Sequence, residues 1–367
     1  MRLSTLCLLI LLSTISMSVL AQAKDRVKIG IIGLTHDHIG FMGNPDFLER
    51  VEIIGVAESN DTLRAKYAKA FGWANEVLYD DWEKMLKEAK PAGVMVFTSP
   101  YEHLEVVELC GPMGIHVMVE KPFSVSLEHA EAMVNLAEKH KILLLTNYET
   151  TWYATNHGAY SYLHDQKKLG ELRKVVVHDG HYGPVELGCT PEFLEWLLDP
   201  KLNGGGALTD FGCYGANLIT WLMQGELPLS VRAITKFTKD DPAYTGVDDD
   251  ATILLEYPNM IGVIQASWNW PYNRKDMEVY GTTGFFHPQN GTEALYLKDK
   301  DSQPEKIVLE PREAPYNNPV TYFAACIAGE INPAGSLNSL ENNFIVSIIL
   351  DAARKSAETG QEVRFEE

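Results

Sequence analysis

Five short apolar runs, separated by amphipathic stretches, occupy the first part of the chain and constrain its fold more than any other feature. The apolar runs are 27–32, 51–57, 93–98, 115–119 and 142–146. The stretches between them, among them 62–71, 82–89 and 127–140, have the spacing of helices with one apolar face. Continuous Val/Ile/Leu runs alternating with helices are typical of a parallel sheet covered on both faces. We therefore predict an α/β fold that begins with a doubly wound domain of the nucleotide-binding type.

The pattern changes after Asn147. Helices are predicted over 151–164, from Pro191 to Leu198, over 207–223 and over 340–359, and strands over 172–181, 231–237, 251–257, 261–268 and 277–280. Neighbouring strands without helices between them favour an open, largely antiparallel sheet. We predict a dinucleotide-binding domain over 24–147 and an α+β domain for substrate binding and oligomer contacts over 148–367.

The first 23 residues have the features of a secretory signal: a lone Arg2, an apolar run over 6–12 and the small-residue ending Ala21-Gln22-Ala23. The apolar run is too short for a membrane-spanning helix. We therefore expect an exported, periplasmic protein that is free of the membrane once the signal is removed. The formal net charge of −19 argues against nucleic acid as a partner.

Four cysteines remain after the signal segment: Cys110, Cys189, Cys213 and Cys326. They show no Cys-x-x-Cys spacing and no dense pattern, so we interpret them as ordinary buried thiols. An exported protein could instead oxidise a pair of them, and the sequence leaves that alternative open.

Lys121 stands at the end of the fourth apolar run, within Glu120-Lys121-Pro122. Open parallel sheets bind ligands at the carboxyl ends of their strands, so this lysine would face a ligand. A free lysine titrates near ~10.4 and serves in proton transfer near neutrality only where its surroundings lower the pKa. An isolated Lys-Pro is more often a surface lysine beside a turn. The surrounding strand pattern favours a catalytic lysine.

The first apolar run leads into Gly33-Leu34-Thr35-His36-Asp37-His38, where a nucleotide-binding fold places a glycine-rich turn and a helix start. Laid on Gly-x-Gly-x-x-Gly, only Gly33 matches, because Thr35 and His38 occupy the other glycine positions. A side chain at the second position either displaces the cofactor or adds a hydroxyl contact. We expect Gly33, Thr35, His36 and His38 to contact a dinucleotide.

His36, Asp37 and His38 also invite a metal interpretation, since imidazoles and carboxylates are sound ligands. Residues of a His-x-His on a tight turn need not converge, however, and no compact third-ligand motif accompanies them. We predict no metal site.

Glu58 follows the second apolar run, 25 residues after Gly33, close to the spacing of a ribose-binding acid. A carboxylate there would accept hydrogen bonds from an adenosine ribose and repel a 2′-phosphate, which favours NAD over NADP. The alternative is an incidental charge near the start of a helix.

In the second half, Gly204-Gly205-Gly206 precedes a predicted helix that carries Asp210 and Tyr214. These two residues are four apart, so on one helix both side chains would lie on the same face and address the same small molecule. The alternative is a flexible loop followed by a core helix with a buried tyrosine.

Taken together, these motifs resemble the glucose-fructose oxidoreductase, inositol dehydrogenase and MocA (Gfo/Idh/MocA) family, from about Val27 to the end of the chain. The motifs that match are Pro100 with His103, Glu120-Lys121-Pro122, Gly204-Gly205-Gly206 with Asp210 and Tyr214, Asp249-Asp250-Ala251 and Gly281-Thr282-Thr283-Gly284. The resemblance implies an N-terminal Rossmann domain, a C-terminal domain whose open sheet often forms oligomer contacts, and NAD(P)-linked chemistry on sugars or polyols.

The resemblance also implies roles for single residues. Lys121 would be the family's catalytic lysine, Asp210 its partner acid, and Tyr214 the residue at a position that holds His or Tyr in the family. The further positions expected at the cofactor are Thr98, Pro100, His103 and Glu120. A homodimer or homotetramer is expected.

The leading hypothesis is an exported NAD-dependent oxidoreductase that exchanges hydride between a carbohydrate or polyol secondary alcohol and nicotinamide. Tyr214 or Lys121 would take the hydroxyl proton while Asp210 orients that group. The candidates for substrate contact are Asn147, His181 and Trp268. Trp268 would either stack on a sugar ring or pack in the core or at a subunit interface.

Two other hypotheses stay open. The signal lacks a twin-arginine pair, so the chain would cross the membrane unfolded and capture its dinucleotide afterwards. A redox-neutral enzyme that oxidises a glycoside, eliminates and returns the hydride would suit a compartment without free NAD. A carbohydrate-binding relative that has lost cofactor turnover would suit Thr35 and His38, although Lys121, Asp210 and Tyr214 count against it.

Overall fold

The computed structural model describes residues 26–365, so the predicted signal segment lies outside the described residues. The first sheet has six parallel strands in the order β3-β2-β1-β4-β5-β6. They are β1 (Val27–Ile32), β2 (Val51–Ala57), β3 (Leu78–Tyr79), β4 (Gly93–Val96), β5 (His116–Glu120) and β6 (Leu144–Asn147). The predicted parallel sheet is confirmed, and the short β3 is an edge strand that the apolar pattern did not predict.

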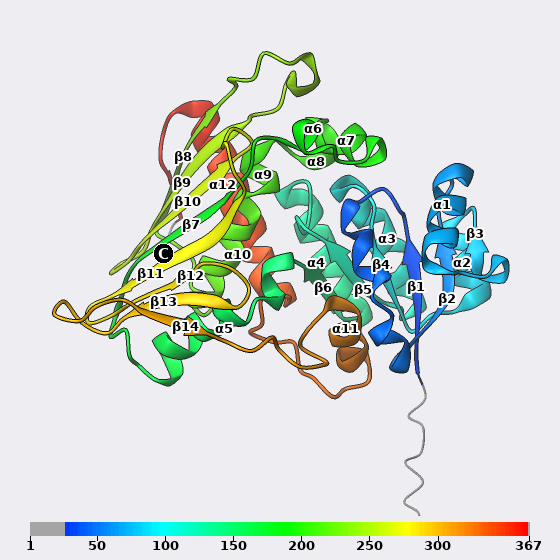
Figure 1. The fold of residues 1–367 in the computed structure, drawn as a ribbon. Coiled ribbons are helices and arrows are strands. Elements are labelled where there is room, and N and C mark those ends of the chain that lie inside the picture. The colour runs from blue at the N-terminus through cyan, green and yellow to red at the C-terminus, as the bar shows by residue number, and fades with distance from the viewer. Residues whose placement is uncertain (1–25, 366–367) are drawn as a thin grey trace, which may run out of the picture.

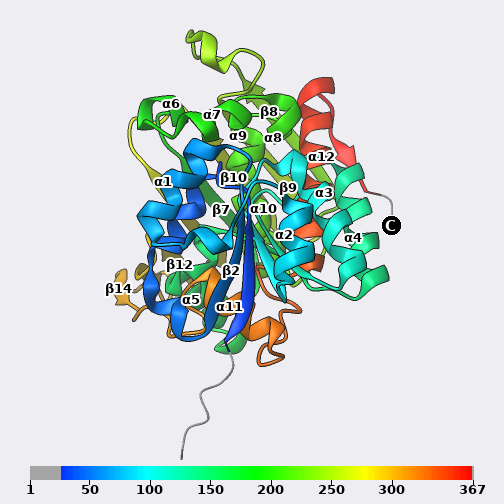
Figure 2. The same ribbon diagram turned by 90° about the vertical axis from the view of Figure 1, so that its right-hand side faces the viewer.

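Helices cover both faces of this sheet (Figure 2). The α-helices of this part are α1 (Asp61–Phe71), α2 (Trp82–Ala89), α3 (His103–Cys110) and α4 (Leu127–His140). Side-chain caps fix where α1 and α4 begin: the Asn60 side chain accepts from the Thr62 and Leu63 amides, and Ser126 accepts from the His129 amide. The α2, α3 and α4 helices pack on one face, opposite α1.

The segment after β1 differs from the expected helix start, because it forms two 3-10 helices, η1 (Asp37–Gly43) and η2 (Pro45–Glu49). The His36 side chain caps η1 and Asn44 caps η2. These caps, together with Pro45, interrupt the segment and prevent one continuous α-helix. Further 3-10 turns are η3 (Asn75–Val77), η4 (Pro100–Glu102), η5 (Gly111–Met113) and η8 (Pro242–Tyr244).

The second sheet has nine strands in the order β14-β13-β12-β11-β7-β10-β9-β8-β15. They are β7 (Leu172–Gly180), β8 (Ser230–Lys236), β9 (Asp250–Glu256), β10 (Ile261–Ser267), β11 (Arg274–Gly281), β12 (Phe285–Pro288), β13 (Glu293–Leu297), β14 (Glu305–Val308) and β15 (Val363–Arg364). Only the β7 and β10 neighbours run parallel. The predicted open, largely antiparallel sheet is confirmed.

Two predicted helices of the second half are interrupted. The helix predicted over 151–164 is divided into η6 (Glu149–Trp152), α5 (Ala154–Tyr160) and a π-helical turn, η7 (Ser161–Asp165). The helix predicted over 207–223 is divided at Phe211 into α9 (Ala207–Asp210) and α10 (Gly212–Leu222). The other helices are α6 (Pro184–Leu187), α7 (Pro191–Leu197), α8 (Pro200–Asn203), α11 (Pro319–Ile327) and α12 (Leu340–Thr359). Within residues 26–365, no helix combines the length and apolar character needed to cross a bilayer.

The α11 helix returns to the first sheet although it follows the strands of the second. Val320 and Phe323 join the core formed around Ile29 and Ile31. At Gly93 of β4 a Cβ atom would lie 2.6 Å from Ile327 Cδ1, so the strand and the helix approach closely. The division of the chain at residue 147 stays a prediction, and α11 shows that core contacts cross it.

The helices α10 and α12 lie against one face of the second sheet, on the side of the first sheet (Figure 1). Every residue of α10 is buried. At Gly215 a Cβ atom would meet Ile264 Cγ2 at 2.5 Å, so this glycine lets α10 rest directly on β10. The packing holds the residues after β5 opposite the ends of β7 and β11.

The four described cysteines are thiols. Cys110, Cys213 and Cys326 are buried, and burial raises the pKa of Cys110 and Cys326 to about 12. Cys189 is half-buried at the border of the cavity described next. Three of the four thiols are therefore buried as interpreted, whereas Cys189 is not.

Candidate active site

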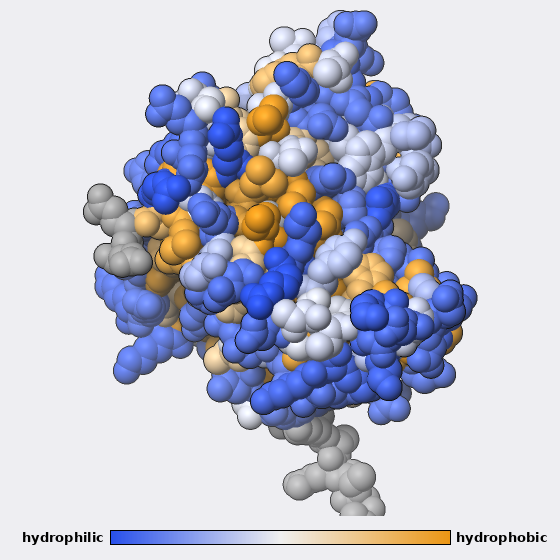
Figure 3. Space-filling model, turned by 90° about the vertical axis from the view of Figure 1, so that its left-hand side faces the viewer, coloured by the Kyte–Doolittle hydropathy of each residue, from blue (hydrophilic) through white to orange (hydrophobic). Residues whose placement is uncertain are grey.

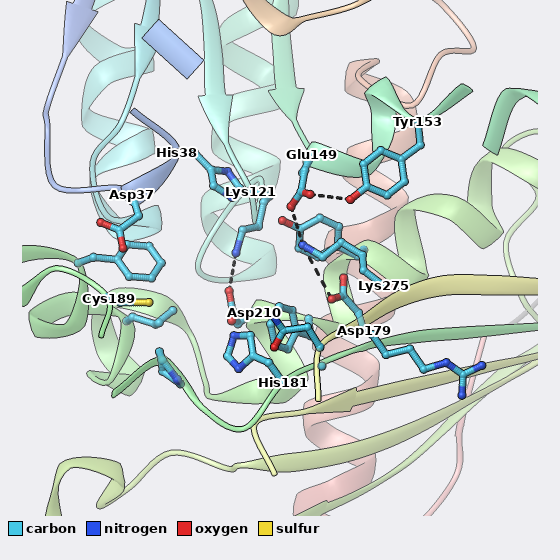
Figure 4. A pocket seen from close by; sticks show the side chains of 18 of the residues that line it. Asp37, His38, Lys121, Glu149, Tyr153, Asp179, His181, Cys189, Asp210 and Lys275 are labelled. Atoms are coloured by element: carbon cyan, nitrogen blue, oxygen red, sulfur yellow. Dashed lines mark hydrogen bonds and ion pairs between the residues drawn. The ribbon is translucent and has the colours of Figure 1, made fainter. Parts of the chain in front are cut away.

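A cavity of about 470 Å³ lies where the carboxyl end of the first sheet meets the second (Figure 4). This volume is in the range of small-molecule sites. Its charged, imidazole and phenol lining groups are Asp37, His38, Lys121, Glu149, Tyr153, Asp179, His181, Asp210, Tyr214, Arg274 and Lys275. Both halves of the chain therefore contribute to one polar cavity.

Lys121 and Asp210 form a buried ion pair in this cavity. Lys121 directly follows β5 and Asp210 is the last residue of α9, so the pair joins the two sheets. Burial alone would lower the pKa of Lys121, but the Asp210 carboxylate outweighs it and raises the pKa. Burial would raise the pKa of Asp210, and the Lys121 ammonium lowers it instead. Both groups therefore keep their charges.

Tyr214 lines the same cavity from the first turns of α10. Its ring centroid lies 5.4 Å from Lys121 Nζ and 4.5 Å from Lys275 Nζ. Burial, with Glu149 and Asp179 nearby, raises the pKa of Tyr214 well above its usual range. The predicted meeting of Lys121, Asp210 and Tyr214 is present, although Asp210 and Tyr214 reach it from two short helices instead of one.

A second charged cluster, formed by Lys275, Glu149, Asp179 and Tyr153, faces the first across the cavity. Lys275 Nζ lies 2.8 Å from Glu149 Oε2 and 4.0 Å from Asp179 Oδ1, and Tyr153 donates to Glu149 Oε1 at 2.6 Å. Burial would raise the pKa of Glu149, but Lys275 lowers it to about 2. Sequence reasoning missed this cluster. The available signals were an acid two residues after β6 and another near the end of β7. The sequence does not show that these two acids meet, because only the topology brings them together.

The three candidates for substrate contact have different positions. His181 lines the cavity, and burial lowers its pKa to about 4. Asn147 is buried, and its Nδ2 donates to Glu120 Oε1 at 2.6 Å. Trp268 is fully buried and its Nε1 donates to Asp210 Oδ2 at 3.0 Å. Neither Asn147 nor Trp268 lines the cavity. This position favours the alternative in which Trp268 packs in the core, where it holds Asp210 in place and does not stack on a sugar ring.

At one position, Gly33, the turn after β1 has the tight geometry expected of a dinucleotide site. Gly33 has φ +75°, and a Cβ there would lie 2.3 Å from Thr98 Cγ2, so glycine is required. Thr98 is buried at the end of β4, followed by Pro100 in η4. His103 is buried at the start of α3, with its Nδ1 3.1 Å from the Phe123 carbonyl, and burial lowers its pKa to about 4.

Glu58 lies at the carboxyl end of β2, the position expected of a ribose-binding acid. Its Oε2 accepts from the Leu34 amide at 2.9 Å and its Oε1 accepts from the Asn60 amide at 2.9 Å. The carboxylate therefore ties the glycine turn to the start of α1.

Backbone amides of the turn are largely engaged within the chain. Those that donate are Gly33 to Ala57, Thr35 and His36 to the Phe97 carbonyl, Leu34 to Glu58, His38 to His36 Nδ1 and Ile39 to the His36 carbonyl. From the second half, Thr190 donates to the Asp37 carboxylate through its amide and hydroxyl, at 3.2 and 2.5 Å. The Gly33 conformation and Glu58 fit a dinucleotide, whereas these amides are not free to receive its pyrophosphate as they stand.

His36, His38 and Glu120 converge, although the residues of a His-x-His on a tight turn need not. One ligand-capable atom from each lies within 4.8 Å of the others, and His38 Nδ1 is 2.7 Å from Glu120 Oε2. His36 Nδ1 already accepts from the His38 amide, and the Lys121 ammonium nearby opposes a second cation. These contacts favour a hydrogen-bonded cluster, and the absence of a metal stays a prediction.

Comparison with protein families gives two matches along the chain. Residues 27–148 match the model described as oxidoreductase family, NAD-binding Rossmann fold. Residues 161–287 match the GFO/IDH/MocA C-terminal domain. Together the two segments cover more than half of the chain; the first contains the whole six-stranded sheet and the second contains β7 to β11 of the nine-stranded sheet.

Curated relatives are similar over part of their length. Trans-1,2-dihydrobenzene-1,2-diol dehydrogenase of Xenopus tropicalis is 24% identical over 243 residues, which are 66% of this chain and 66% of that protein. D-xylose 1-dehydrogenase, NADP(+), of Haloarcula marismortui is 25% identical over 281 residues, 74% of each chain. The chain thus spans just under two thirds of the dihydrodiol dehydrogenase.

Solved structures share the fold over nearly the whole chain. The aldose-aldose oxidoreductase of Caulobacter crescentus, complexed with glycerol, has a TM-score of 0.79 at 21% identity, covering 93% of this chain and 100% of that one. An inositol dehydrogenase homolog of Azotobacter vinelandii, complexed with NAD+, has a TM-score of 0.81 at 17% identity, covering 94% and 98%. At these identities the likeness concerns the fold.

Proposed function

Because the chain belongs to the Gfo/Idh/MocA oxidoreductase family, we propose that it is an NAD-dependent dehydrogenase of a carbohydrate or polyol. It would move hydride between a secondary alcohol and nicotinamide. The observation that carries the proposal is the buried Lys121–Asp210 pair beside Tyr214, in a cavity at the carboxyl end of the first sheet. Ligands of open parallel sheets bind at that end.

The roles of the three residues follow from their charges. The raised pKa of Lys121 keeps an ammonium in the cavity, where it would stabilise charge that develops on the substrate oxygen. The Tyr214 phenol keeps its proton and would donate a hydrogen bond to the same oxygen. Asp210, held by Trp268, fixes the position of Lys121. These pKa directions favour charge stabilisation by Lys121 and Tyr214 over proton removal by either.

Gly33 and Glu58 would hold the dinucleotide, with Thr98, Pro100, His103, Glu120 and Lys121 bordering it as the family resemblance implies. A bound NAD supplies the acceptor for hydride. A surface depression lined by Ser59, the residue after Glu58, is also lined by four acids: Asp80, Asp81, Glu83 and Glu105. These carboxylates would repel a 2′-phosphate, which supports NAD over NADP.

A carbohydrate or polyol suits the rest of the cavity. Its wall combines carboxylates and a lysine with the amides of Asn273, Gln289 and Asn290 and the ring of Phe211. Such groups can bind several neighbouring hydroxyls while a ring packs against C–H surface. Two relatives are named as dehydrogenases of a diol and of xylose, which supports a carbohydrate or polyol substrate. Export to the periplasm, proposed from residues 1–23, would bring the enzyme to extracytoplasmic sugars.

A carbohydrate-binding protein without cofactor turnover is the second candidate. The engaged amides of the turn and the Thr190–Asp37 contact over it favour this candidate, because both occupy hydrogen-bonding groups that a pyrophosphate would use.

The experiment begins with the purified mature protein and its bound molecules. Mass spectrometry of material released on denaturation should detect NAD, or added NAD should raise the Tm more than NADP does. With saturating NAD, a panel of sugars and polyols should yield NADH absorbance.

Other outcomes separate the alternatives. Glycoside cleavage without NADH accumulation would select the redox-neutral enzyme. No dinucleotide binding, together with sugar binding by calorimetry, would replace the dehydrogenase with the carbohydrate-binding protein.

A further inference from the structure

Asp179 is a buried acid whose ion pair with Lys275 is long, at 4.0 Å. It lies near the carboxyl end of β7, lines the cavity and is 1% exposed. Within the described residues, neither of its side-chain oxygens accepts a hydrogen bond. Asp248, another buried acid, differs because its oxygens accept from the Gly206 and Leu208 amides at 2.8 and 2.7 Å. A buried carboxyl without a hydrogen bond lowers the stability of the fold unless a ligand or a proton bonds to it. This arrangement therefore indicates that Asp179 binds a ligand or a proton.

Charged groups surround Asp179 from several elements. Lys275, its cross-strand partner on β11, has Nζ 4.0 Å from Oδ1 (Figure 4). Burial raises the pKa of Asp179 to about 8; Glu149 and Asp210 also raise it, and Lys275 and Lys121 lower it in part. The phenols of Tyr153 and Tyr214 and the Cys213 thiol also interact with it. A pKa of about 8 would let the carboxyl gain or lose a proton near neutral pH, beside groups that line the same cavity.

The other groups around this part of the cavity are poor proton acceptors. Lys121 and Lys275 stay ammonium ions, because paired carboxylates outweigh burial and raise both pKa values. Glu149 and Asp210 are paired carboxylates with lowered pKa values. His181 Nδ1 already accepts from the Gly183 amide at 2.9 Å. Proton exchange works best with a group whose pKa lies near the working pH.

We propose that Asp179 is a catalytic residue, the acceptor of the hydroxyl proton when the substrate alcohol is oxidised. This inference rests on the proposed dehydrogenase function. The O–H bond breaks and its proton joins the Asp179 carboxylate; the C–H electron pair leaves as hydride to the dinucleotide, and a C=O bond forms. In the reverse direction Asp179 returns the proton to the alkoxide. Lys121 and Tyr214 stabilise the oxygen, and Lys275 holds the ionised carboxylate.

The test compares Asp179→Asn with Asp276→Asn. Asp276 is the next residue along β11 from Lys275 and pairs with His178, so its side chain faces the opposite side of the sheet. With NAD and an oxidisable sugar, Asp179→Asn should lose about 10²–10⁴-fold in kcat and lose the ionisation near pH 8 from the kcat profile. Folded Asp276→Asn should keep that ionisation. His38→Gln is assayed alongside, because His38 also lines the cavity and its ring bonds Glu120.

A second readout needs no activity. The folded pKa of Asp179, about 8, exceeds its unfolded value near 3.8, so the folded state loses stability as pH rises between these values. Asp179→Asn abolishes that loss. The Tm of Asp179→Asn relative to wild type should therefore increase from pH 5 to pH 8.5, whereas Asp276→Asn should show no such increase.

The outcomes separate this inference from the function on which it rests. If wild type reduces NAD and Asp179→Asn keeps its kcat and pH profile, or His38→Gln alone loses the ionisation, the assignment to Asp179 is overturned. If wild type reduces no NAD, the dehydrogenase fails and the Tm comparison decides whether Asp179 is a proton-exchanging group. A Tm difference that is constant with pH overturns the inference in either case.

Discussion

At the scale of single residues, Lys121 and Asp210 depend on each other for their charged states. Both are almost fully buried, and each keeps its charge because of the other. Removing one partner of such a pair leaves a charge buried without compensation, which is strongly destabilising. Trp268 further ties Asp210 to the core of the second sheet. The same ion pair therefore serves the proposed hydride transfer and stabilises the folded protein.

We expect Lys121→Ala to abolish NADH formation and to destabilise the protein by about 3–5 kcal/mol, because Asp210 would remain buried and unpaired. The double variant Lys121→Met with Asp210→Asn should recover most of the stability but no activity. Urea unfolding and NADH absorbance measure the two effects separately. Retained activity in folded Lys121→Ala would exclude Lys121 from the mechanism.

At the scale of elements, the loop before α9 sets where Asp210 stands. Asp248 accepts from the Gly206 and Leu208 amides through its side chain and from Ala207 through its carbonyl. A Cβ at Gly206 would lie 1.9 Å from the Asp248 carbonyl oxygen, so the two backbones touch. Because α9 has one turn and ends at Asp210, a shift of its start moves Asp210 directly.

Gly206→Ala should therefore destabilise the protein by about 1–3 kcal/mol and lower kcat, because the added methyl group forces the loop away from Asp248. Gly40→Ala is the matched control, since a Cβ there would meet nothing within 4 Å. Thermal unfolding and steady-state kinetics of the two variants give the comparison. Equal Tm values would show that the loop accommodates the methyl group.

At the scale of the whole molecule, the outer face of the second sheet is open. Ile234, Leu254 and Ile261 are 60%, 42% and 49% exposed on β8, β9 and β10. Figure 3 shows apolar side chains gathered on this side of the molecule. An apolar sheet face of this kind is typical of a surface covered by a partner. We expect a second copy of the chain there, in a homodimer or homotetramer.

The double variant Ile234→Lys with Leu254→Lys should dissociate the oligomer, because the added charges would be buried in the interface. Glu138→Lys, at an exposed position of α4, is the control and should keep the wild-type mass. Multi-angle light scattering at micromolar concentration measures the mass. A monomeric wild-type protein would contradict the expected interface.

Local sequence signals were sufficient for much of the fold and for part of the site. The bounds of β1, β2, α2, α4 and α12 agree with the sequence because each depends on its own periodicity, its caps or a following glycine. The placement of Lys121 at a strand end follows from the same pattern. Its meeting with Asp210 and Tyr214 was expected from motifs that the resemblance brought together.

Tertiary contacts decided the rest. Asp179 faces Lys275 because β7 pairs with β11 in one register, and no local pattern encodes pairing between strands so far apart in the sequence. The return of α11 to the first sheet, the break at Phe211 and the engaged amides of the glycine turn likewise depend on long-range packing. The sequence by itself determined the strands of the first sheet apart from β3, the strands β7 to β11 of the second sheet, several helices and the position of the lysine. Only the assembled sheets determined which acids surround the lysine, because burial and neighbouring charge set their protonation.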